Sequence, residues 1–419
     1  MKLEILNALD ANSIIKELNS SKDKLVAASA LEKLKLPNRK TEKYRYFSDI
    51  ESIISKDWQI LEPQEPKDEA SGEKIVIQDG TLINRGDIDG VNVEYKEFND
   101  IDSQHFDPLY FLSHLLAKKA IIIRCTKDCS FEIEHNFSKE DVLINYRVVI
   151  LTDANSHVQV YESFKGDAKG SFILSGYDMF VSRDANFKFI KSHTLKDAKY
   201  LPIFTSRYKI DSNANMKLSS FDFAFANGLN LFRAELKENA NIDAAHLLYV
   251  TNLAKYGIVS EIVHEGKSSI SKQKAKSILD NKARGIFDAL IRVQNSAKWT
   301  KAHQNSKAIL LESGAYMASK PQLEIYIDDL EASHGSTTGQ LDEQQLFYLR
   351  SRGIKLSDAR KMLILAFANE IISSVDDEYL ANKIYAEFER AYYGNYELDC
   401  IKTCDGCEEL VLKEENENN

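Results

Sequence analysis

The chain has 419 residues, 43% of them hydrophobic, and a formal net charge of −10. The acidic balance argues against a nucleic-acid-binding protein, because such proteins carry basic patches that show in the total charge. No stretch is long and apolar enough to span a membrane, and the first residues lack the apolar core of a signal peptide. The five cysteines, an odd number, fit a reducing compartment. We therefore expect a cytoplasmic protein whose partners are neither nucleic acid nor membrane.

Residues 1–75 are predicted to form an N-terminal helical domain that ends in a linker. Apolar residues recur at spacings of three and four in Ser13–Leu18 and in Asp23–Leu36, as in amphipathic helices, and Pro37 ends the second run. Glu62–Glu73 is rich in proline and acidic residues, a composition typical of linkers. The expected order is two short helices, a charged turn and a connection to the next unit.

Residues 76–341 are predicted to be a β-helix core. Short runs that alternate in polarity or are rich in β-branched and aromatic residues indicate strands. Examples are Val142–Val149, His157–Tyr161, Asn186–Ile190 and Met216–Phe221. An Ala-Asn pair recurs in polar turns at 154–155, 185–186, 214–215 and 240–241, at intervals of 31, 29 and 26 residues. Such a period indicates stacked repeats, and the abundance of strands favours a mainly β fold, a parallel β-helix or β-solenoid.

The asparagine of the pair suits these turns because asparagine tolerates left-handed backbone and bonds its own chain. We therefore expect the Ala-Asn positions to mark the corners between stacked strands. The alternative is a β-sandwich whose turns share Ala-Asn by coincidence.

Residues 342–396 are predicted to form a C-terminal helical domain. Asp342 can cap a helix that ends at Gly353, and Ser357 can cap the next. A third helix is expected from Asp376. Four apolar residues lie on one stripe of that third helix: Leu380, Ile384, Phe388 and Tyr392.

Residues 397–419 form an acidic tail that holds three cysteines. Cys400, Cys404 and Cys407 have the spacing C-x3-C-x2-C. Three thiolates so spaced can ligate a soft metal or an iron–sulfur cluster with one open position. The alternative is a reduced tail without a metal.

Catalytic motifs are absent from the sequence. Gly266-Lys267-Ser268 is the only phosphate-loop candidate, but the glycine that such a loop requires five positions earlier is Glu261, whose charge would repel a phosphate. Gly266 is therefore interpreted as part of a turn. The nine histidines show no pair at helical ligand spacing. We expect no catalytic residues and no ATP hydrolysis by the chain alone.

Three segments resemble the SufB/SufD family of iron–sulfur cluster assembly proteins. Residues 321–342 read PQLEIYIDDLEASHGSTTGQLD and residues 346–354 read LFYLRSRGI. Near the N-terminus, Leu36-Pro37, Lys40, Glu42 and Tyr44-Arg45-Tyr46 are similar to a third family pattern, with Tyr44 in the usual place of a tryptophan. Ser-His-Gly at 333–335 and the modest length favour the SufD branch. The resemblance implies a right-handed parallel β-helix between N- and C-terminal helical domains.

The resemblance also implies a function and partners. Such proteins are non-ATPase scaffold subunits of a SufBCD complex, in which the β-helix pairs with a SufB-like subunit and the C-terminal helices dock a SufC-like ABC ATPase. A homodimer is the alternative pairing. No cofactor is expected to bind stably, and iron or a transient iron–sulfur cluster is expected at the SufB interface.

His334 is the candidate residue for that interface. Imidazole is a good iron ligand and titrates near neutral pH. It is expected to follow a strand at Leu323–Ile327 and to lie at the junction of solenoid and helical domain, where the alternative is that it only caps the last turn of the solenoid. Many SufD proteins have a cysteine two residues earlier, but this chain has Ala332, which argues against a ligand there.

The candidates for ATPase docking lie at the start of the C-terminal helical domain. They are Phe347, Tyr348, Arg350 and Arg352, and aromatic and arginine side chains are enriched among residues that dominate binding energy. The alternative is that Phe347 belongs to the core of its own domain.

Two other functions fit parts of the sequence. A β-helical carbohydrate-active enzyme would need a row of acids along one face, for which the turns offer Asp153, Asp184 and Asp211. A stand-alone iron–sulfur carrier would use the tail cysteines.

Overall fold

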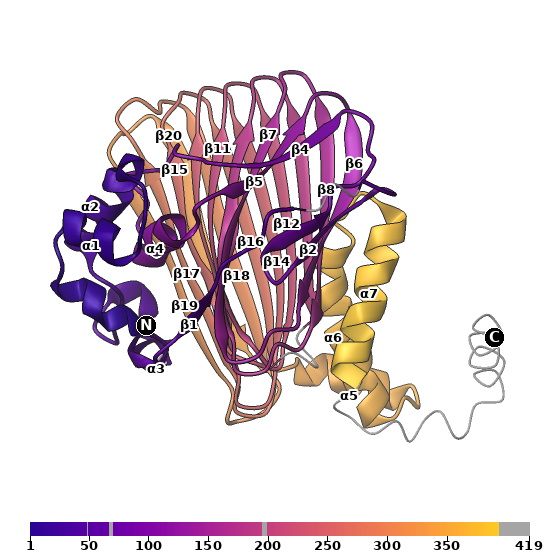
Figure 1. Ribbon diagram of the computed structural model, residues 1–419. Coiled ribbons are helices and arrows are strands. Elements are labelled where there is room, and N and C mark those ends of the chain that lie inside the picture. The colour runs from indigo at the N-terminus through magenta and orange to yellow at the C-terminus, as the bar shows by residue number, and fades with distance from the viewer. Residues whose placement is uncertain (48, 67–69, 195–198, 394–419) are drawn as a thin grey trace.

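The structure is a computed structural model that describes residues 1–47, 49–66, 70–194 and 199–393. In this part of the chain, two ten-stranded sheets lie face to face, and helices cover the outer face of each (Figure 1). From β5 onward the chain alternates between the sheets, so that each strand pairs in parallel with the strand two positions further along. The expected mainly β solenoid with helices at both ends is confirmed. The domain boundaries stay predictions.

The two sheets are named here by their last strands. The β19 sheet contains, in spatial order, β19 (Tyr316–Ile325), β17 (Arg284–Val293), β15 (Lys255–His264), β13 (Gly228–Leu236), β11 (Leu201–Ile210), β9 (Phe172–Val181), β7 (Val142–Thr152), β5 (Ala120–Cys125) and β4 (Val91–Lys96), with β1 (Gln59–Leu61) beside β7. The β20 sheet contains β20 (Leu330–Gly339), β18 (Thr300–Leu310), β16 (Ile270–Leu279), β14 (Asn241–Val250), β12 (Asn215–Ala224), β10 (Asn186–Thr194), β8 (His157–Gly166), β6 (Cys129–Phe137), β2 (Lys74–Gln78) and β3 (Thr81–Asn84). Only β2–β3 and β4–β5 pair antiparallel among these strands.

The Ala-Asn repeat marks corners of the β20 sheet, but its asparagine has the expected left-handed backbone at only one of the four corners, Asn155. Left-handed backbone occurs one position before the alanine, at Asp184, Asn213 and Asn239, with φ of 59°, 60° and 56°. The alanines that follow are completely buried, because the corner folds them into the interior. At the first corner the register differs by one residue, since Asn155 itself is left-handed and Ser156 takes the buried position.

The asparagines that follow the buried alanines begin strands and form a ladder. Asn241 Nδ2 donates to Asn215 Oδ1 at 2.7 Å, and Asn215 Nδ2 donates to Asn186 Oδ1 at 3.1 Å. A second ladder joins the left-handed residues of the same corners, at 3.0 Å for each bond. Side-chain amides carry both a donor and an acceptor, so each repeat can bond the ones before and after it. The repeat in the sequence therefore reflects hydrogen bonding between stacked turns.

The N-terminal helices pack against the outer face of the β19 sheet. They are η1 (Leu3–Ala8), α1 (Ala11–Glu17), η2 (Lys22–Lys24), α2 (Leu25–Leu34), η3 (Glu42–Tyr44) and α3 (Ile50–Ser55), joined by α4 (Pro108–Leu116) from later in the chain. One apolar cluster contains residues of these helices together with Phe172, Leu231 and Ile286 from the sheet. The helices therefore share a core with the solenoid.

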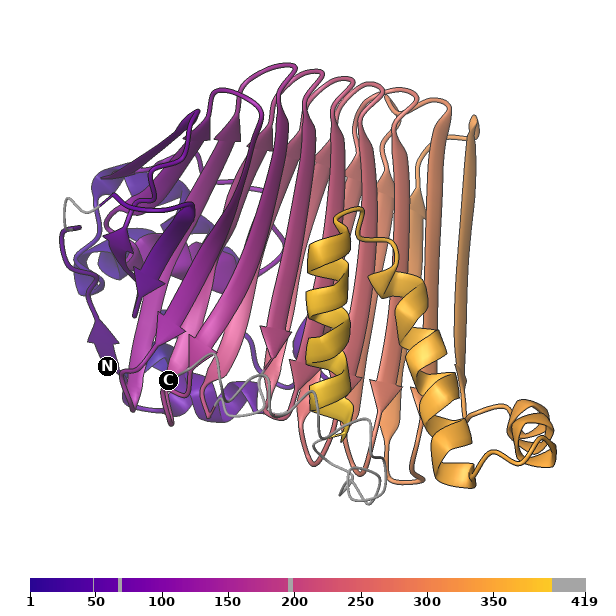
Figure 2. The ribbon, with the colours of Figure 1, turned by 90° about the vertical axis from the view of Figure 1, so that its right-hand side faces the viewer.

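The C-terminal helices are α5 (Glu343–Ser351), α6 (Leu356–Ile372) and α7 (Glu378–Tyr393). Asp342 caps α5 as expected, accepting from Gln344 N at 2.8 Å. The prediction for Ser357 was wrong, because α6 begins at Leu356 and Lys355 holds the N-cap position. The predicted stripe of α7 is buried against the β20 sheet, with Phe221 and Tyr249 in the same apolar cluster. Figure 2 shows α6 and α7 lying along the strands, with α5 beyond them.

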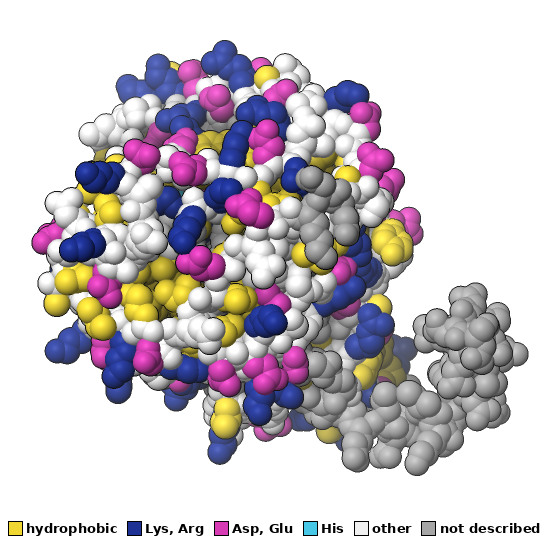
Figure 3. All heavy atoms as spheres, in the orientation of Figure 1, with side chains coloured by type: hydrophobic (Ala, Val, Ile, Leu, Met, Phe, Trp, Pro, Cys, Tyr) yellow, Lys and Arg dark blue, Asp and Glu magenta, His cyan; other side chains and the backbone are white. Residues whose placement is uncertain are grey.

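Charges of both signs are interspersed over the face seen in Figure 3. Of the helices described, none has the length and apolar character needed to cross a membrane.

Candidate functional site

The solenoid ends in two edge strands, β19 and β20. Each pairs with a described strand on one side only, β19 with β17 and β20 with β18. At this end Leu323, Ile327, Leu330 and Ala332 are only partly buried where they border the interior core. Figure 2 shows these last strands at the far end of the row. An edge strand leaves backbone N–H and C=O groups free to pair with another chain. We call this region, β19 and β20 with the residues between them, the open end.

His334 follows the expected strand, now β19, but it lies in the middle of a further strand, β20, so its expected place at the junction with the helical domain was wrong. Apart from Thr337 and Thr338, the segment from Leu330 to Gly339 lacks the β-branched and aromatic residues that favour strands, and it forms a strand in register with β18. His334 pairs with Gln304 of β18, whose side chain is buried inside the solenoid. Because side chains in register point to the same face, His334 faces the interior at the open end, where it is exposed.

The neighbours of His334 on the same face are small or polar. Ala332 pairs with Ala302, and Ser336 pairs with Ser306. Ser336 Oγ donates to Ser319 Oγ at 2.8 Å, which in turn donates to Ser306 Oγ at 3.0 Å, so that β20, β19 and β18 are joined. Position 332, where the resemblance expects a cysteine, thus belongs to the same inward-facing row as His334.

The ATPase-docking candidates lie on and just after α5, which follows β20 directly. Phe347 is 74% exposed and Tyr348 is 57% exposed. Arg350 and Arg352 are exposed as well, and the Arg352 guanidinium lies 5.0 Å from the centre of the Tyr348 ring. No residue of α5 is buried. This exposure argues against the alternative in which Phe347 belongs to a core of its own domain.

The Gly266 segment is a turn between β15 and β16, as interpreted. A Cβ atom at Gly266 would lie 2.1 Å from the backbone nitrogen of Glu238, so the glycine allows two turns to stack closely. Strand β16, not a helix, follows the segment. Glu261, in β15, is buried and forms an ion pair with Arg233. The arrangement lacks the helix N-terminus that holds a phosphate.

The three aspartates considered for a carbohydrate-active enzyme do not form a continuous row. Asp153 and Asp211 precede the left-handed corner residues by two positions, but the corner between them has Ser182 at that place and the next has Lys237. Asp184 occupies a left-handed corner position itself and accepts from Asn213. These corners therefore give no support to that alternative.

Metal binding has no preformed site in the described part of the chain, where no three His, Cys, Asp or Glu side chains are grouped to hold an ion. Cys400, Cys404 and Cys407 lie outside the described residues, so the proposed metal site in the tail stays a prediction.

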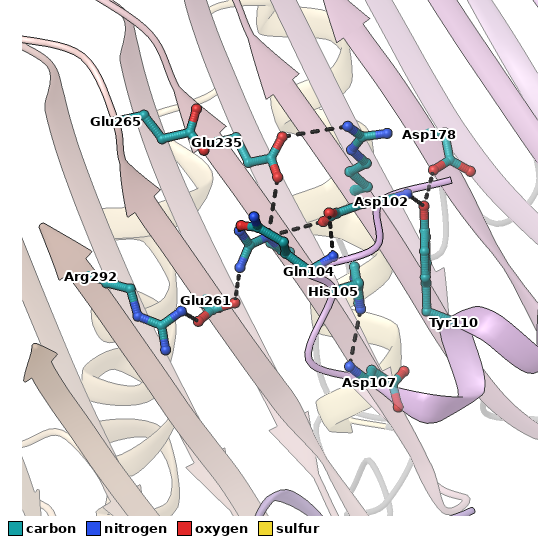
Figure 4. A network of polar contacts seen from close by, with 12 residues as sticks. Asp102, Gln104, His105, Asp107, Tyr110, Asp178, Glu235, Glu261, Glu265 and Arg292 are labelled. Atoms are coloured by element: carbon teal, nitrogen blue, oxygen red, sulfur yellow. Dashed lines mark hydrogen bonds and ion pairs between the residues drawn. The ribbon is translucent and has the colours of Figure 1, made fainter. Parts of the chain in front are cut away.

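A buried ionic network on the outer face of the β19 sheet was not predicted from the sequence. Arg233 of β13 forms ion pairs with Glu261 of β15 and, at 3.0 Å, with Asp102. Figure 4 shows the segment with Asp102 and Asp107 lying over these strands. The network joins α4 and the segment before it to the solenoid. Its members come from different strands and from the segment before α4, and only the tertiary fold places them together.

Burial raises the pKa of two carboxyl groups in this segment. Burial raises the pKa of Asp107 to about 6, although Tyr44 Oη donates to it at 2.7 Å. Burial, assisted by Glu235, also raises the pKa of Asp102 to about 6. Asp178 behaves differently. Burial opposes its ionisation, but the charge of Arg147 at 2.7 Å holds the pKa of Asp178 well below its usual range.

The N-terminal motif residues connect the helices to this network and to the open end. Tyr44 bonds to Asp107, which caps α4 by accepting from Leu109 N at 3.1 Å. Lys43 forms an ion pair with Asp288 of β17 at 2.9 Å, and Glu42 pairs with Lys320 of β19. The motif therefore holds the N-terminal helices against the last strands of the β19 sheet.

A family model described as SUF system FeS cluster assembly, SufBD core domain, matches residues 135–367. The match covers more than half of the 419 residues and runs from β6 into α6. The chain belongs to the SufB/SufD family. The open end, His334 and the exposed residues of α5 lie within the SufBD core match, so the resemblance expected from the sequence is confirmed.

Several members of the SufB/SufD family are similar to parts of this chain. The iron–sulfur cluster assembly protein SufD of Escherichia coli is 43% identical over 116 residues, which is 28% of this chain and 27% of that protein. A SufBD family protein of Synechocystis is 33% identical over 171 residues, 41% of this chain and 36% of that protein. SufD of Bacillus subtilis is 28% identical over 131 residues, 31% of this chain and 30% of that protein. The aligned parts span between 27% and 36% of these relatives.

Proposed function

We propose that this chain is a non-ATPase scaffold subunit of a SufBCD complex for iron–sulfur cluster assembly. Membership of the SufB/SufD family supports a role in iron–sulfur cluster assembly. The observation that best supports a scaffold is the open end of the solenoid. A scaffold needs surfaces for partners rather than a catalytic pocket. The chain offers two such surfaces, the edge strands and the exposed helix α5.

The open end is proposed to pair with a SufB-like subunit. Its edge strands can extend their sheets into those of another solenoid, and the partly buried apolar side chains of the core would be covered by that contact. Exposed apolar residues at this end, Ile325 at 41% and Tyr326 at 55%, add to the area that a partner would bury. A second copy of this chain is the alternative partner.

Helix α5 is proposed to dock a SufC-like ATPase. Phe347 and Tyr348 are exposed aromatic residues on a helix that buries none of its own side chains. Such anchors contribute to affinity when a partner's pocket removes them from water. Because only three residues separate β20 from α5, a movement of the docked ATPase would act directly on the open end.

His334 is proposed to act at the interface with the SufB-like subunit. Its imidazole faces the open end from an edge strand, next to small side chains that leave room for iron or a nascent cluster. Iron and the cluster are cargo of the complex in this proposal. A neutral imidazole nitrogen can ligate iron, and the same group can carry a proton.

Co-purification with untagged neighbours from its own genome tests the scaffold proposal. The tagged full-length chain is expected to retain a SufB-like subunit and an ATPase, and ATP hydrolysis is expected only when the ATPase is present. A tagged chain that elutes alone or as a homodimer from such an extract would contradict the proposed complex.

His334→Ala tests the interface role. The side chain is exposed, and such changes cost within about 0.5 kcal/mol of unfolding free energy, so the complex is expected to assemble at normal yield. Iron and sulfide content per complex is expected to fall in the same preparations. Ala332→Cys in the His334→Ala background is the matched control and is expected to restore little. An equal loss of yield and cluster content would show that His334 is structural.

A further inference from the structure

A row of buried amide and imidazole groups leads from the solenoid interior to His334. Gln304 and Gln273 are paired in register on β18 and β16, and both are at most 2% exposed. Gln304 Nε2 donates to Gln273 Oε1 at 3.1 Å. Gln273 Nε2 donates to Ser260 Oγ at 3.0 Å and lies 3.4 Å from His246 Nε2. The row therefore crosses three strands of the β20 sheet.

The contacts of His246 agree with the direction of this row. Burial lowers the pKa of His246 to about 4, so its ring is neutral at pH 7, with one donor and one acceptor nitrogen. Its Nδ1 lies 2.7 Å from Ser220 Oγ, and its Nε2 faces an amide nitrogen that can only donate. With Nε2 as acceptor, Gln273 turns its oxygen toward Gln304. Gln304 then donates through its nitrogen to Gln273, and its oxygen is left without a donor.

That oxygen has no partner. Gln304 Oε1 is buried and makes no hydrogen bond within the described residues. A buried acceptor without a donor destabilises the fold, so a group that supplies a donor is favoured there. The residue paired with Gln304 on β20 is His334, on the same inward face. The charged neighbours Lys301, His303 and Glu331 belong to the opposite, outward faces of β18 and β20.

We propose that Gln304 is a positioning residue for His334. After a rotation of the exposed His334 side chain, Gln304 Oε1 accepts a hydrogen bond from the ring N–H of His334. The lone pair of the other ring nitrogen is then directed toward the open end. In metal sites the partner of one imidazole nitrogen decides which nitrogen can ligate the metal. Gln304 would thus select the ring form of His334 that can bind iron. This inference rests on the proposed function of His334.

Titration of His334 in the full-length chain tests the pairing. Histidine labelled with ¹³C and ¹⁵N reports the pKa and the tautomer of each ring, and the His334→Gln variant assigns the signal. Gln304→Glu places a carboxylate beside the ring and is expected to raise the measured pKa of His334 by about one unit. Gln304→Met removes the acceptor and is expected to change the tautomer ratio. Asn305→Ala, at the neighbouring outward position of β18, is the control and is expected to change neither.

Two outcomes decide the proposal. An unchanged titration and tautomer ratio in both Gln304 variants, with normal thermal unfolding, would overturn it, because the two side chains would not meet. In the assembled complex, Gln304→Met is expected to lower cluster content at normal complex yield, and Gln304→Glu, which keeps an acceptor, is expected to retain more of it. Full cluster content in His334→Ala would overturn the proposed function of His334. The pairing of Gln304 with His334 would still be decided by the titration alone.

Discussion

At the scale of single residues, burial controls the chemistry of the polar groups that join the N-terminal part to the solenoid. Asp107 shows this most directly. It is completely buried, it accepts from Tyr44 Oη and Leu109 N through Oδ1, and its Oδ2 has no hydrogen-bond partner among the described residues. Burial is the largest influence on its pKa, which rises to about 6. Protonation of this carboxyl is therefore favoured by folding.

Asp107→Asn is expected to flatten the dependence of stability on pH. With a pKa of about 6 folded against 3.8 unfolded, the folded chain binds more protons between these values. The free energy of unfolding therefore falls as pH rises from about 4 to 6, by about 2–3 kcal/mol from this group. Asparagine keeps the cap and the acceptor for Tyr44 but does not titrate. Urea unfolding of both proteins at pH 4, 5, 6 and 7 measures the difference in slope.

Asp376→Asn is the control for that experiment. Hydrogen bonds from Lys188 and Lys217 lower the pKa of Asp376, so its stabilisation is lost as pH falls and its slope has the opposite sign. Equal slopes for Asp107→Asn and the parent chain would show that Asp107 ionises in the folded state as it does in the unfolded state.

At the scale of elements, α5 differs from α6 and α7. The latter two bury Ile364, Ile371 and Phe388 against the β20 sheet, whereas α5 buries nothing. Removing the whole C-terminal helical part would uncover that apolar face of the sheet. Single substitutions on α5 therefore test docking more cleanly than a truncation does.

Phe347→Ala is expected to weaken binding of the SufC-like ATPase by about tenfold or more, because an anchor residue contributes over 1.4 kcal/mol. Tyr379→Ala on α7 is the matched control, since Tyr379 is equally exposed, at 74%, but lies away from α5. Calorimetric titration of the ATPase into each full-length variant gives the affinities. Unchanged affinity in Phe347→Ala would place the docking surface elsewhere.

At the scale of the whole molecule, the two ends of the solenoid differ. The first end is formed by the antiparallel pairs β2–β3 and β4–β5, which interrupt the parallel stacking. The last end stops at β19 and β20 in full parallel register. An end in regular register is the one that can continue into another solenoid.

Ile325→Asp is expected to prevent pairing with the SufB-like subunit while leaving the chain folded. Ile325 is 41% exposed at the end of β19, so an aspartate there is tolerated in water but costly in a dry interface. Leu253→Asp is the control, because Leu253 is 73% exposed in the corner between β14 and β15. Sedimentation of mixtures with the SufB-like subunit distinguishes the two. Normal pairing by Ile325→Asp would exclude the open end as the interface.

The sequence by itself determined the class of fold and the family. Stacked turns repeat their corner chemistry, so a period of 26–31 residues was visible without a structure. Helix α7 could be placed from its stripe, and α5 from its cap at Asp342, because helix signals are local. The segments around Ser333-His334-Gly335 and Tyr44 carried the family resemblance.

Only the tertiary structure decided which residues meet. The sequence of β20 has few of the β-branched and aromatic residues that favour strands, so its strand depends on the ladder that β18 provides, and His334 lies in that strand instead of at a junction. The left-handed corner position, the pairing of Gln304 with His334 and the contact of Asp102 with Arg233 also depend on register. Strands that pair across about 30 residues of chain place side chains together through backbone hydrogen bonds, and a shift of one residue would turn each to the other face.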